Sequence, residues 1–180
     1  GQLKIAVLGG TGKEGSGLAF RWALKGHDVT LGSRDAAKAA AGAQELNTLL
    51  AGKAAVKGAA NRDAAAQAEI VVLAVPFAAQ QATALDVKDA LAGKILIDVT
   101  VPLAPPKVDR VQLPNGESAV VALQRALGEG VKVVSAFQNV SAVHLKEPDH
   151  AVDCDVLVCG DDGAARETVI TLAQDAGLRA

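Results

Sequence analysis

Short apolar runs alternate with longer amphipathic stretches along almost the whole chain. The apolar runs predict strands at residues 3–8, 29–31, 70–75, 95–99, 131–137 and 155–159, with a weaker signal around Val56. The run at 70–75 is apolar at every position, which is typical of a strand covered on both faces. The stretches between these runs predict helices at 12–25, 35–50, 61–68, 77–91, 119–127 and from Asp161 or Asp162 to about 176.

Cap residues and breakers support these boundaries. Asp35, Asn61 and either Asp161 or Asp162 are placed to cap the helices that follow them, and the polar, proline-rich stretch 103–116 predicts a long loop. No internal repeat or linker divides the chain, so residues 1–180 are predicted to form a single domain. The regular alternation of strand and helix predicts an α/β fold: a doubly wound, mostly parallel sheet with helices on both faces.

The first predicted strand is followed at once by a glycine-rich turn that opens a helix, with the sequence Gly10-Thr11-Gly12-Lys13-Glu14-Gly15. This turn fits the G-x-G-x-x-G pattern of dinucleotide-binding sites. In that pattern Gly10 permits the tight turn, Gly12 lets a pyrophosphate approach the backbone, and Gly15 lets the helix pack closely on the sheet. The N–H groups and partial positive charge of the helix N-terminus complete a phosphate site. The turn therefore predicts a Rossmann-type dinucleotide-binding domain.

The end of the second predicted strand indicates which dinucleotide is bound. Sites that prefer NAD usually place Asp or Glu there, to accept hydrogen bonds from the ribose hydroxyls. Here the strand ends with Gly32, Ser33 and Arg34, and Lys38 follows one turn later. A hydroxyl and two cations suit the 2′-phosphate of NADP, although a solvent-exposed surface role for Arg34 is the alternative. We therefore expect NADP(H) as the cofactor, with Ser33, Arg34 and Lys38 in its site.

The later strand ends are further candidate sites, because ligands of open α/β sheets bind outside the carboxyl ends of the strands. A rigid apolar edge follows the run at 70–75 and can pack on adenine or nicotinamide. The next two strand ends add backbone amides, hydroxyls and carboxamides. We expect these ends to contribute six cofactor-binding residues: Val75, Pro76, Phe77, Val99, Ala136 and Asn139.

Composition and residue spacing exclude several classes of function. A formal net charge of -2 argues against a nucleic-acid partner, and no apolar run approaches the roughly 18–20 residues of a membrane helix. Cys154 and Cys159 are spaced to lie on opposite faces of a strand, so they are interpreted as small buried thiols in a reducing compartment. Because residues 1–4 also lack the pattern of a signal peptide, we expect a cytoplasmic protein.

No metal-ligand spacing and no nucleophile with a paired base occurs, and the chain contains no Tyr. We predict no catalytic side chain and no metal site. Asp98 could act as an acid or base, but it is better interpreted as holding the loop that follows it. Hydride transfer between two conjugated rings needs mainly alignment and exclusion of water, which such a site can provide.

Four segments carry a family resemblance. Residues 5–12, 32–34, 134–137 and 158–162 read Ile-Ala-Val-Leu-Gly-Gly-Thr-Gly, Gly-Ser-Arg, Val-Ser-Ala-Phe and Val-Cys-Gly-Asp-Asp. With these segments, in order over nearly the whole chain, the sequence resembles the NADPH-dependent coenzyme F420 reductases (F420:NADP oxidoreductases). The resemblance implies hydride transfer between C4 of nicotinamide and C5 of a deazaflavin, and it implies a homodimer. It also places Thr11, Ser33, Arg34 and Lys38 on NADP.

The resemblance further implies an acceptor side lined by Val99, Val101 and Pro102, and the neighbouring strand end adds Gln138 and Val140 as substrate-binding candidates. Two departures from the family pattern occur. Gln138-Asn139 stands where members often have His-Thr, and the helical segment with which members usually continue is expected to be absent beyond Ala180. The alternatives are an NADPH-dependent reductase of a flavin, ferric or small carbonyl acceptor, or a non-catalytic NADP-binding sensor module.

Overall fold

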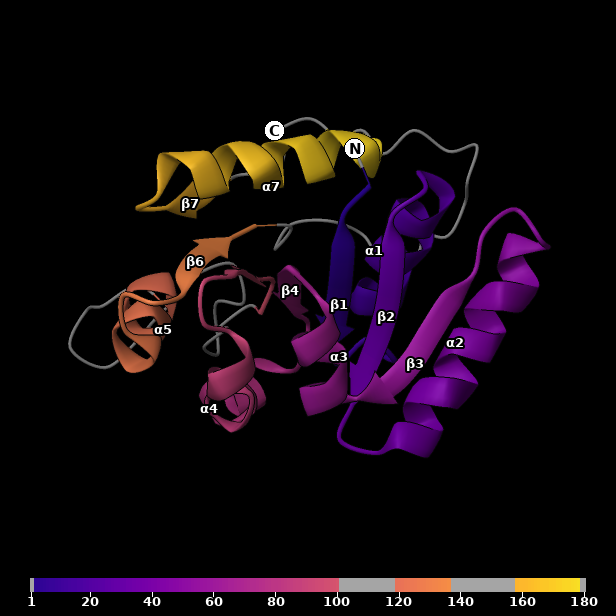
Figure 1. Ribbon diagram of the computed structural model, residues 1–180, viewed down its shortest axis with the longest axis horizontal. Helices are drawn as coiled ribbons and strands as arrows, with labels where there is room; N and C mark the ends of the chain where they lie inside the picture. Colours follow the sequence, from indigo (N-terminus) through magenta and orange to yellow (C-terminus); the bar gives the residue numbers. More distant parts are fainter. Residues whose placement is uncertain (1, 101–118, 137–157, 179–180) are drawn as a thin grey trace, which may run out of the picture.

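The computed structural model describes residues 2–100, 119–136 and 158–178. The strands of this part of the chain form one sheet in the order β3-β2-β1-β4-β5-β6-β7 (Figure 1). Six of them run parallel: β1 (Lys4–Leu8), β2 (Asp28–Ser33), β3 (Val56–Ala60), β4 (Ile70–Leu73), β5 (Ile95–Asp98) and β6 (Lys132–Ser135). The short β7 (Cys159–Gly160) pairs antiparallel with β6. The order of the six parallel strands is that of the Rossmann fold.

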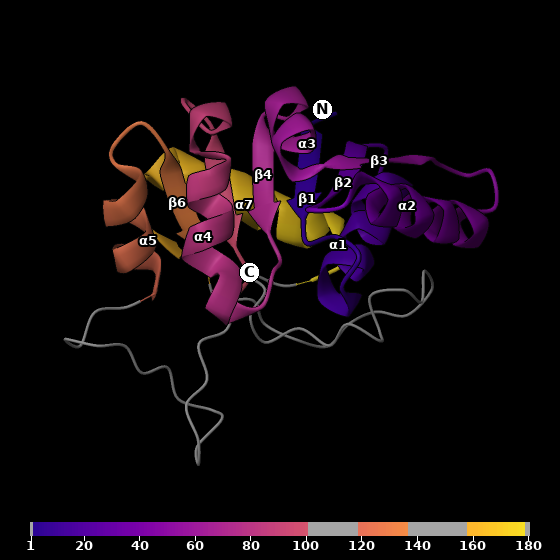
Figure 2. The ribbon, with the colours of Figure 1, turned by 90° about the horizontal axis from the view of Figure 1, so that it is seen from below.

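Helices cover both faces of this sheet (Figure 2). One layer consists of α1 (Lys13–Leu24), α2 (Ala36–Leu50) and α7 (Gly163–Asp175). The other layer consists of α3 (Asn61–Gln67), α4 (Gln80–Asp86) and α5 (Ala119–Leu127). The predicted α/β, doubly wound fold is therefore confirmed. None of the described helices is long and apolar enough to cross a membrane.

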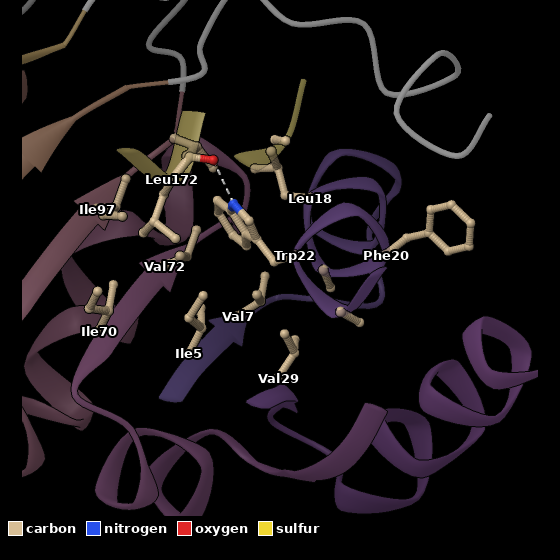
Figure 3. Packing of buried hydrophobic residues seen from close by; sticks show 14 of the residues in the cluster. Ile5, Val7, Leu18, Phe20, Trp22, Val29, Ile70, Val72, Ile97 and Leu172 are labelled. Atoms are coloured by element: carbon tan, nitrogen blue, oxygen red, sulfur yellow. Dashed lines mark hydrogen bonds between the residues drawn. The ribbon is translucent and has the colours of Figure 1, made fainter. Parts of the chain in front are cut away.

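Two apolar layers explain why the central strands lack alternation. Ile5 and Val7 of β1 point into the layer of α1, α2 and α7, whereas Ala6 and Leu8 point into the layer of α3, α4 and α5. Trp22 of α1 lies at the centre of the first layer (Figure 3) and is fully buried. Its Nε1 donates a hydrogen bond of 2.9 Å to the backbone oxygen of Leu172, which joins α1 to α7.

The predicted helix at 77–91 is interrupted. The structure divides it into a 3-10 turn, η1 (Phe77–Ala79), then α4, then a second turn, η2 (Lys88–Ala90). Tertiary hydrogen bonds account for the two ends of α4. The side chain of its first residue is held by β5 and the loop beyond, and its last carbonyl, that of Asp86, accepts a bond of 2.8 Å from Arg62.

Two predicted caps are confirmed and one is wrong. Asp35 accepts a hydrogen bond of 2.9 Å from the N–H of Ala37, and Asp162 caps α7. The N-cap of α3 is Ala60, which offers no side-chain bond, and Asn61 is the first helical residue, buried against the sheet. The predicted loop at 103–116 and residues 155–157 of the last predicted strand lie outside the described residues.

Candidate functional site

The strand order reverses between β1 and β4, since β1 pairs with β2 on one side and with β4 on the other. Ligands of open parallel sheets bind at the carboxyl edge beside such a switch point. The described candidate residues all follow the carboxyl ends of parallel strands, so the topology brings the motifs together along one edge. Asn139, Val101, Pro102, Gln138 and Val140 lie outside the described residues.

The tight turn after β1 depends on Gly9, not on Gly10 as the motif alone predicts. Gly9 has a φ of +73°, a conformation that side chains other than glycine rarely adopt, and its N–H donates to the carbonyl of Gly32 at 3.0 Å. Gly10 is needed for a different reason. A Cβ there would lie 2.7 Å from the carbonyl oxygen of Val7 and 2.8 Å from a methyl group of Leu31.

The roles expected for Gly12 and Gly15 agree with their surroundings. A Cβ on Gly15 would lie 3.0 Å from the Cβ of Ala74, so the absent side chain permits close packing of α1 on the sheet. A Cβ on Gly12, the N-cap of α1, would meet only the carbonyl oxygen of Gly9, at 3.4 Å. This backbone is open to a ligand at the start of a helix, where N–H groups have no intrahelical acceptor. It fits a pyrophosphate.

Glu14 brings an unusual group to this turn. It lies in the first turn of α1, its side chain is largely buried, and its Oε1 has no hydrogen-bond partner among the described residues. Burial disfavours the charged form and raises the pKa of Glu14 from its ordinary 4.5 to about 7. Near neutral pH the carboxyl of Glu14 is therefore protonated in a large fraction of the molecules. Thr11 and Lys13, its neighbours in the motif, are exposed.

The end of β2 presents the expected polar groups. Ser33 is half-buried, and its hydroxyl accepts a hydrogen bond of 3.3 Å from the N–H of Asp35. Arg34 and Lys38 are exposed, and no described residue forms an ion pair with either. Asp35 is engaged as the cap of α2, as predicted. Both cations are therefore available to an anionic ligand.

The ends of β4, β5 and β6 contribute in different ways. Val75 and Phe77 are half-buried and Pro76 is exposed, so all three can offer side-chain surface. Val99 and Ala136 are only 2% and 1% exposed and belong to the core, so their contact with a ligand would go through the backbone.

Sequence reasoning missed two members of a buried polar cluster at the same edge. Asp98 at the end of β5 is hydrogen-bonded to Gln80 and Thr100, and we call these three residues the Asp98 cluster. Gln80 is buried and Gln81 is exposed, although nothing in the local sequence distinguishes them. The role of Thr100 could have been predicted, because an Asp side chain at a strand end often accepts a hydrogen bond from the backbone N–H two residues later.

A cavity of about 520 Å³ lies away from this edge, between the end of α5, the start of β6 and the N-terminus of α7. Its lining includes Arg125, Glu129, Lys132, Asp161 and Asp162, and Lys132 approaches Asp162 at 3.8 Å. Because it opens at the amino end of β6, it is not where parallel sheets bind dinucleotides. The geometry favours the carboxyl edge as the functional site.

The parallel sheet and the open glycine turn at its switch point define a dinucleotide-binding protein of the Rossmann type. Comparison with known sequences narrows this class. The chain belongs to the family described as NADP oxidoreductase coenzyme F420-dependent, whose sequence profile matches residues 4–102. An F420-dependent NADP reductase of Methanothermobacter marburgensis is 44% identical over 99% of this chain and 82% of its own length. One from Methanocaldococcus jannaschii is 42% identical, with the same coverage.

Solved structures agree with this relationship. A proposed F420-dependent NADP reductase from Arthrobacter sp. is 35% identical, covers 98% of this chain and 82% of its own, and superposes with a TM-score of 0.79. A pyrroline carboxylate reductase from Plasmodium falciparum with NADP bound has a TM-score of 0.67 at 15% identity, over all of this chain and 58% of its own. At 15% identity, the similarity to the pyrroline carboxylate reductase concerns the fold alone.

Proposed function

We propose that this protein is an NADP(H)-dependent oxidoreductase that transfers a hydride between nicotinamide C4 and coenzyme F420. The observation that carries the proposal is the 44% identity with an F420-dependent NADP reductase over 99% of the chain. The open turn at Gly12 and the exposed cations Arg34 and Lys38 are what such a function requires at the carboxyl edge.

The cofactor residues divide into three groups. Gly10, Gly12 and Gly15 shape the turn for the pyrophosphate, with Thr11, Lys13 and Glu14 between them. The adenosine 2′-phosphate is held by Ser33, Arg34 and Lys38. The nicotinamide half lies along the later strand ends, near Val75, Pro76, Phe77, Val99, Ala136 and Asn139. The acceptor contacts Val101, Pro102, Gln138 and Val140.

The chain contributes binding and alignment to this reaction, and no side chain needs to transfer a proton. When bound, NADPH would supply the hydride to the deazaflavin, and the proton that the reduced deazaflavin takes up would come from solvent. The residues of the carboxyl edge hold the two rings in register and exclude water between them. The half-buried side chains of Val75 and Phe77 suit this task, because their apolar surface excludes water from the space between the two rings.

The decisive experiment mixes the protein with NADPH and coenzyme F420 and follows the absorbance of both rings. Oxidation of one NADPH for each F420 reduced supports the proposal. Turnover with a flavin, a ferric chelate or a small carbonyl compound but not with F420 would refute it. Tight NADPH binding without turnover on any acceptor would indicate a sensor module.

Two further expectations belong to the same proposal. We propose that the protein forms a homodimer, which the family resemblance supports and which light scattering of the purified protein tests. We also propose a cytoplasmic location, supported by cysteines spaced for neither local pairing nor metal binding. Fractionation of cells that express the protein would test the location.

A further inference from the structure

The Asp98 cluster is buried and closely bonded. Oδ1 of Asp98 accepts hydrogen bonds from the backbone N–H of Thr100 at 3.0 Å and from its hydroxyl at 2.7 Å. Oδ2 accepts a bond of 2.6 Å from Nε2 of Gln80, and that nitrogen also donates to the Thr100 hydroxyl oxygen at 2.9 Å. Asp98, Gln80 and Thr100 are 0%, 3% and 3% exposed.

A carboxylate is a costly choice for this position. Burial raises the pKa of Asp98 against the lowering effect of its hydrogen bonds to Thr100 and Gln80, and no described residue forms an ion pair with it. Burying a charge without a cation opposes folding, and an apolar side chain would serve stability better. The carboxylate instead fixes the positions of its partners, because it can accept hydrogen bonds from several donors on two separate segments at once.

Those segments adjoin the proposed nicotinamide and acceptor side. Gln80 follows three residues after Phe77, in the connection from β4. Thr100 ends the described part of the connection from β5 and directly precedes Val101 and Pro102 in the chain. The backbone oxygen of Asp98 also accepts a bond of 3.1 Å from the N–H of Ala136, just past β6. One residue at the end of β5 thus joins the start of α4, in the connection from β4, to the residue just past β6.

We propose that Asp98 is a positioning residue: with Gln80 and Thr100 it locks the β4 and β5 connections together and so sets the placement of the acceptor relative to the nicotinamide. This proposal rests on the proposed function, because it assumes that an acceptor binds at this edge. Asp98 itself does not transfer a proton in the reaction. Its effect reaches the reacting rings through the backbone that it holds.

The test exchanges the two partners of one hydrogen bond. Asp98→Asn puts an amide N–H where Oδ2 accepts, so Gln80 must either face it with its own N–H or rotate its amide and give up the bond to the Thr100 hydroxyl. Gln80→Glu turns a second carboxylate toward Asp98. The double variant D98N/Q80E restores one donor facing one acceptor with the original charge. Asp86→Asn and Gln81→Glu make the same chemical changes at exposed positions of α4 and serve as matched controls.

Each single variant is expected to lower kcat/KM for F420 by about tenfold or more, because small misplacements of reacting groups are costly. The Kd for NADPH, measured by fluorescence titration, should change far less. The double variant should recover most of the lost kcat/KM, and the two controls should match the unaltered protein. A double variant no better than the singles, or losses in kcat/KM that merely follow losses in NADPH binding and Tm, would overturn the proposal.

Amide hydrogen exchange separates this proposal from the proposed function, since it requires no acceptor. Asp98→Asn should speed exchange at the N–H of Thr100 and around Gln80, and the double variant should restore protection. If the unaltered protein fails to reduce F420, the proposed function is refuted while exchange still reports on the locking. Unchanged protection in both single variants would refute the locking itself.

Discussion

Glu14→Gln should make the stability of this protein less sensitive to pH. The pKa of Glu14 is raised to about 7 from an ordinary 4.5 by burial. The unfolded chain therefore loses this proton at lower pH than the folded chain does, so the folded state binds more protons between these two values. Stability that is fully present below about pH 4.5 is lost as the pH rises to about 7. Glutamine has nearly the same shape and never ionises, so the variant avoids this loss.

The size of the effect follows from the same values. A pKa of about 7 instead of 4.5 corresponds to a free energy of about 3 kcal/mol above neutral pH. For a chain of this size that is roughly 10 °C in Tm. We expect Glu14→Gln to match the unaltered protein near pH 4.5 and to exceed it increasingly up to about pH 8.

Urea or thermal unfolding of both proteins across this pH range is the assay, with Glu45→Gln on the exposed face of α2 as the control. Curves of stability against pH that run parallel for Glu14→Gln and the unaltered protein would refute the burial argument. A second consequence concerns NADPH. An ionised carboxylate beside the pyrophosphate repels it, so the affinity of the unaltered protein should fall above neutral pH and that of Glu14→Gln should not.

Four other substitutions test the site and the fold. Arg34→Asp should weaken NADPH by about 2 kcal/mol or more, roughly thirtyfold, and NADH far less, since only NADPH carries the 2′-phosphate; equal losses in titrations with both would contradict the phosphate role. Gly12→Ala should leave Tm almost unchanged but lower NADPH affinity, whereas Gly15→Ala should destabilise the fold by about 1–3 kcal/mol through overpacking. A fall in Tm for Gly12→Ala with no fall for Gly15→Ala would exclude the assigned roles. Trp22→Phe should cost about 1–3 kcal/mol in urea unfolding, because the carbonyl of Leu172 loses its donor in the core; an unchanged midpoint would show that this bond is dispensable.

The sequence pattern was sufficient to predict those features that depend on hydrophobic periodicity or on contacts within a few residues. The apolar run around β4 predicted a strand covered on both faces, and the two core layers on either side of the sheet confirm it. Asp35 and Asp162 were predictable as caps because a cap bonds to an N–H only two or three residues away. The glycine spacing and the Ser33-Arg34 pair predicted an NADP-dependent protein, which the family confirms, while the contacts of the individual residues with NADP stay predictions.

Pairing between distant residues was not predictable in this way. The positive φ of the turn falls on Gly9, whose N–H donates to the carbonyl of Gly32 on another strand. The helix expected at 77–91 is interrupted because Gln80 bonds to residues 18 and 20 positions away. The burial of Glu14 likewise depends on packing around the first turn of α1, since the motif itself leaves that position open.

The amino-acid sequence by itself therefore determined the order of elements, the doubly wound class and which residue types stand at the ends of β1 and β2. Each of these follows from hydrophobic periodicity or from contacts within a few residues. Only the tertiary structure decided that Asp98 joins the start of α4 to the residue past β6, that Gln80 and not Gln81 is buried, and that Glu14 is desolvated. Burial and long-range hydrogen bonds depend on which segments the folded sheet brings together, and no local pattern records that.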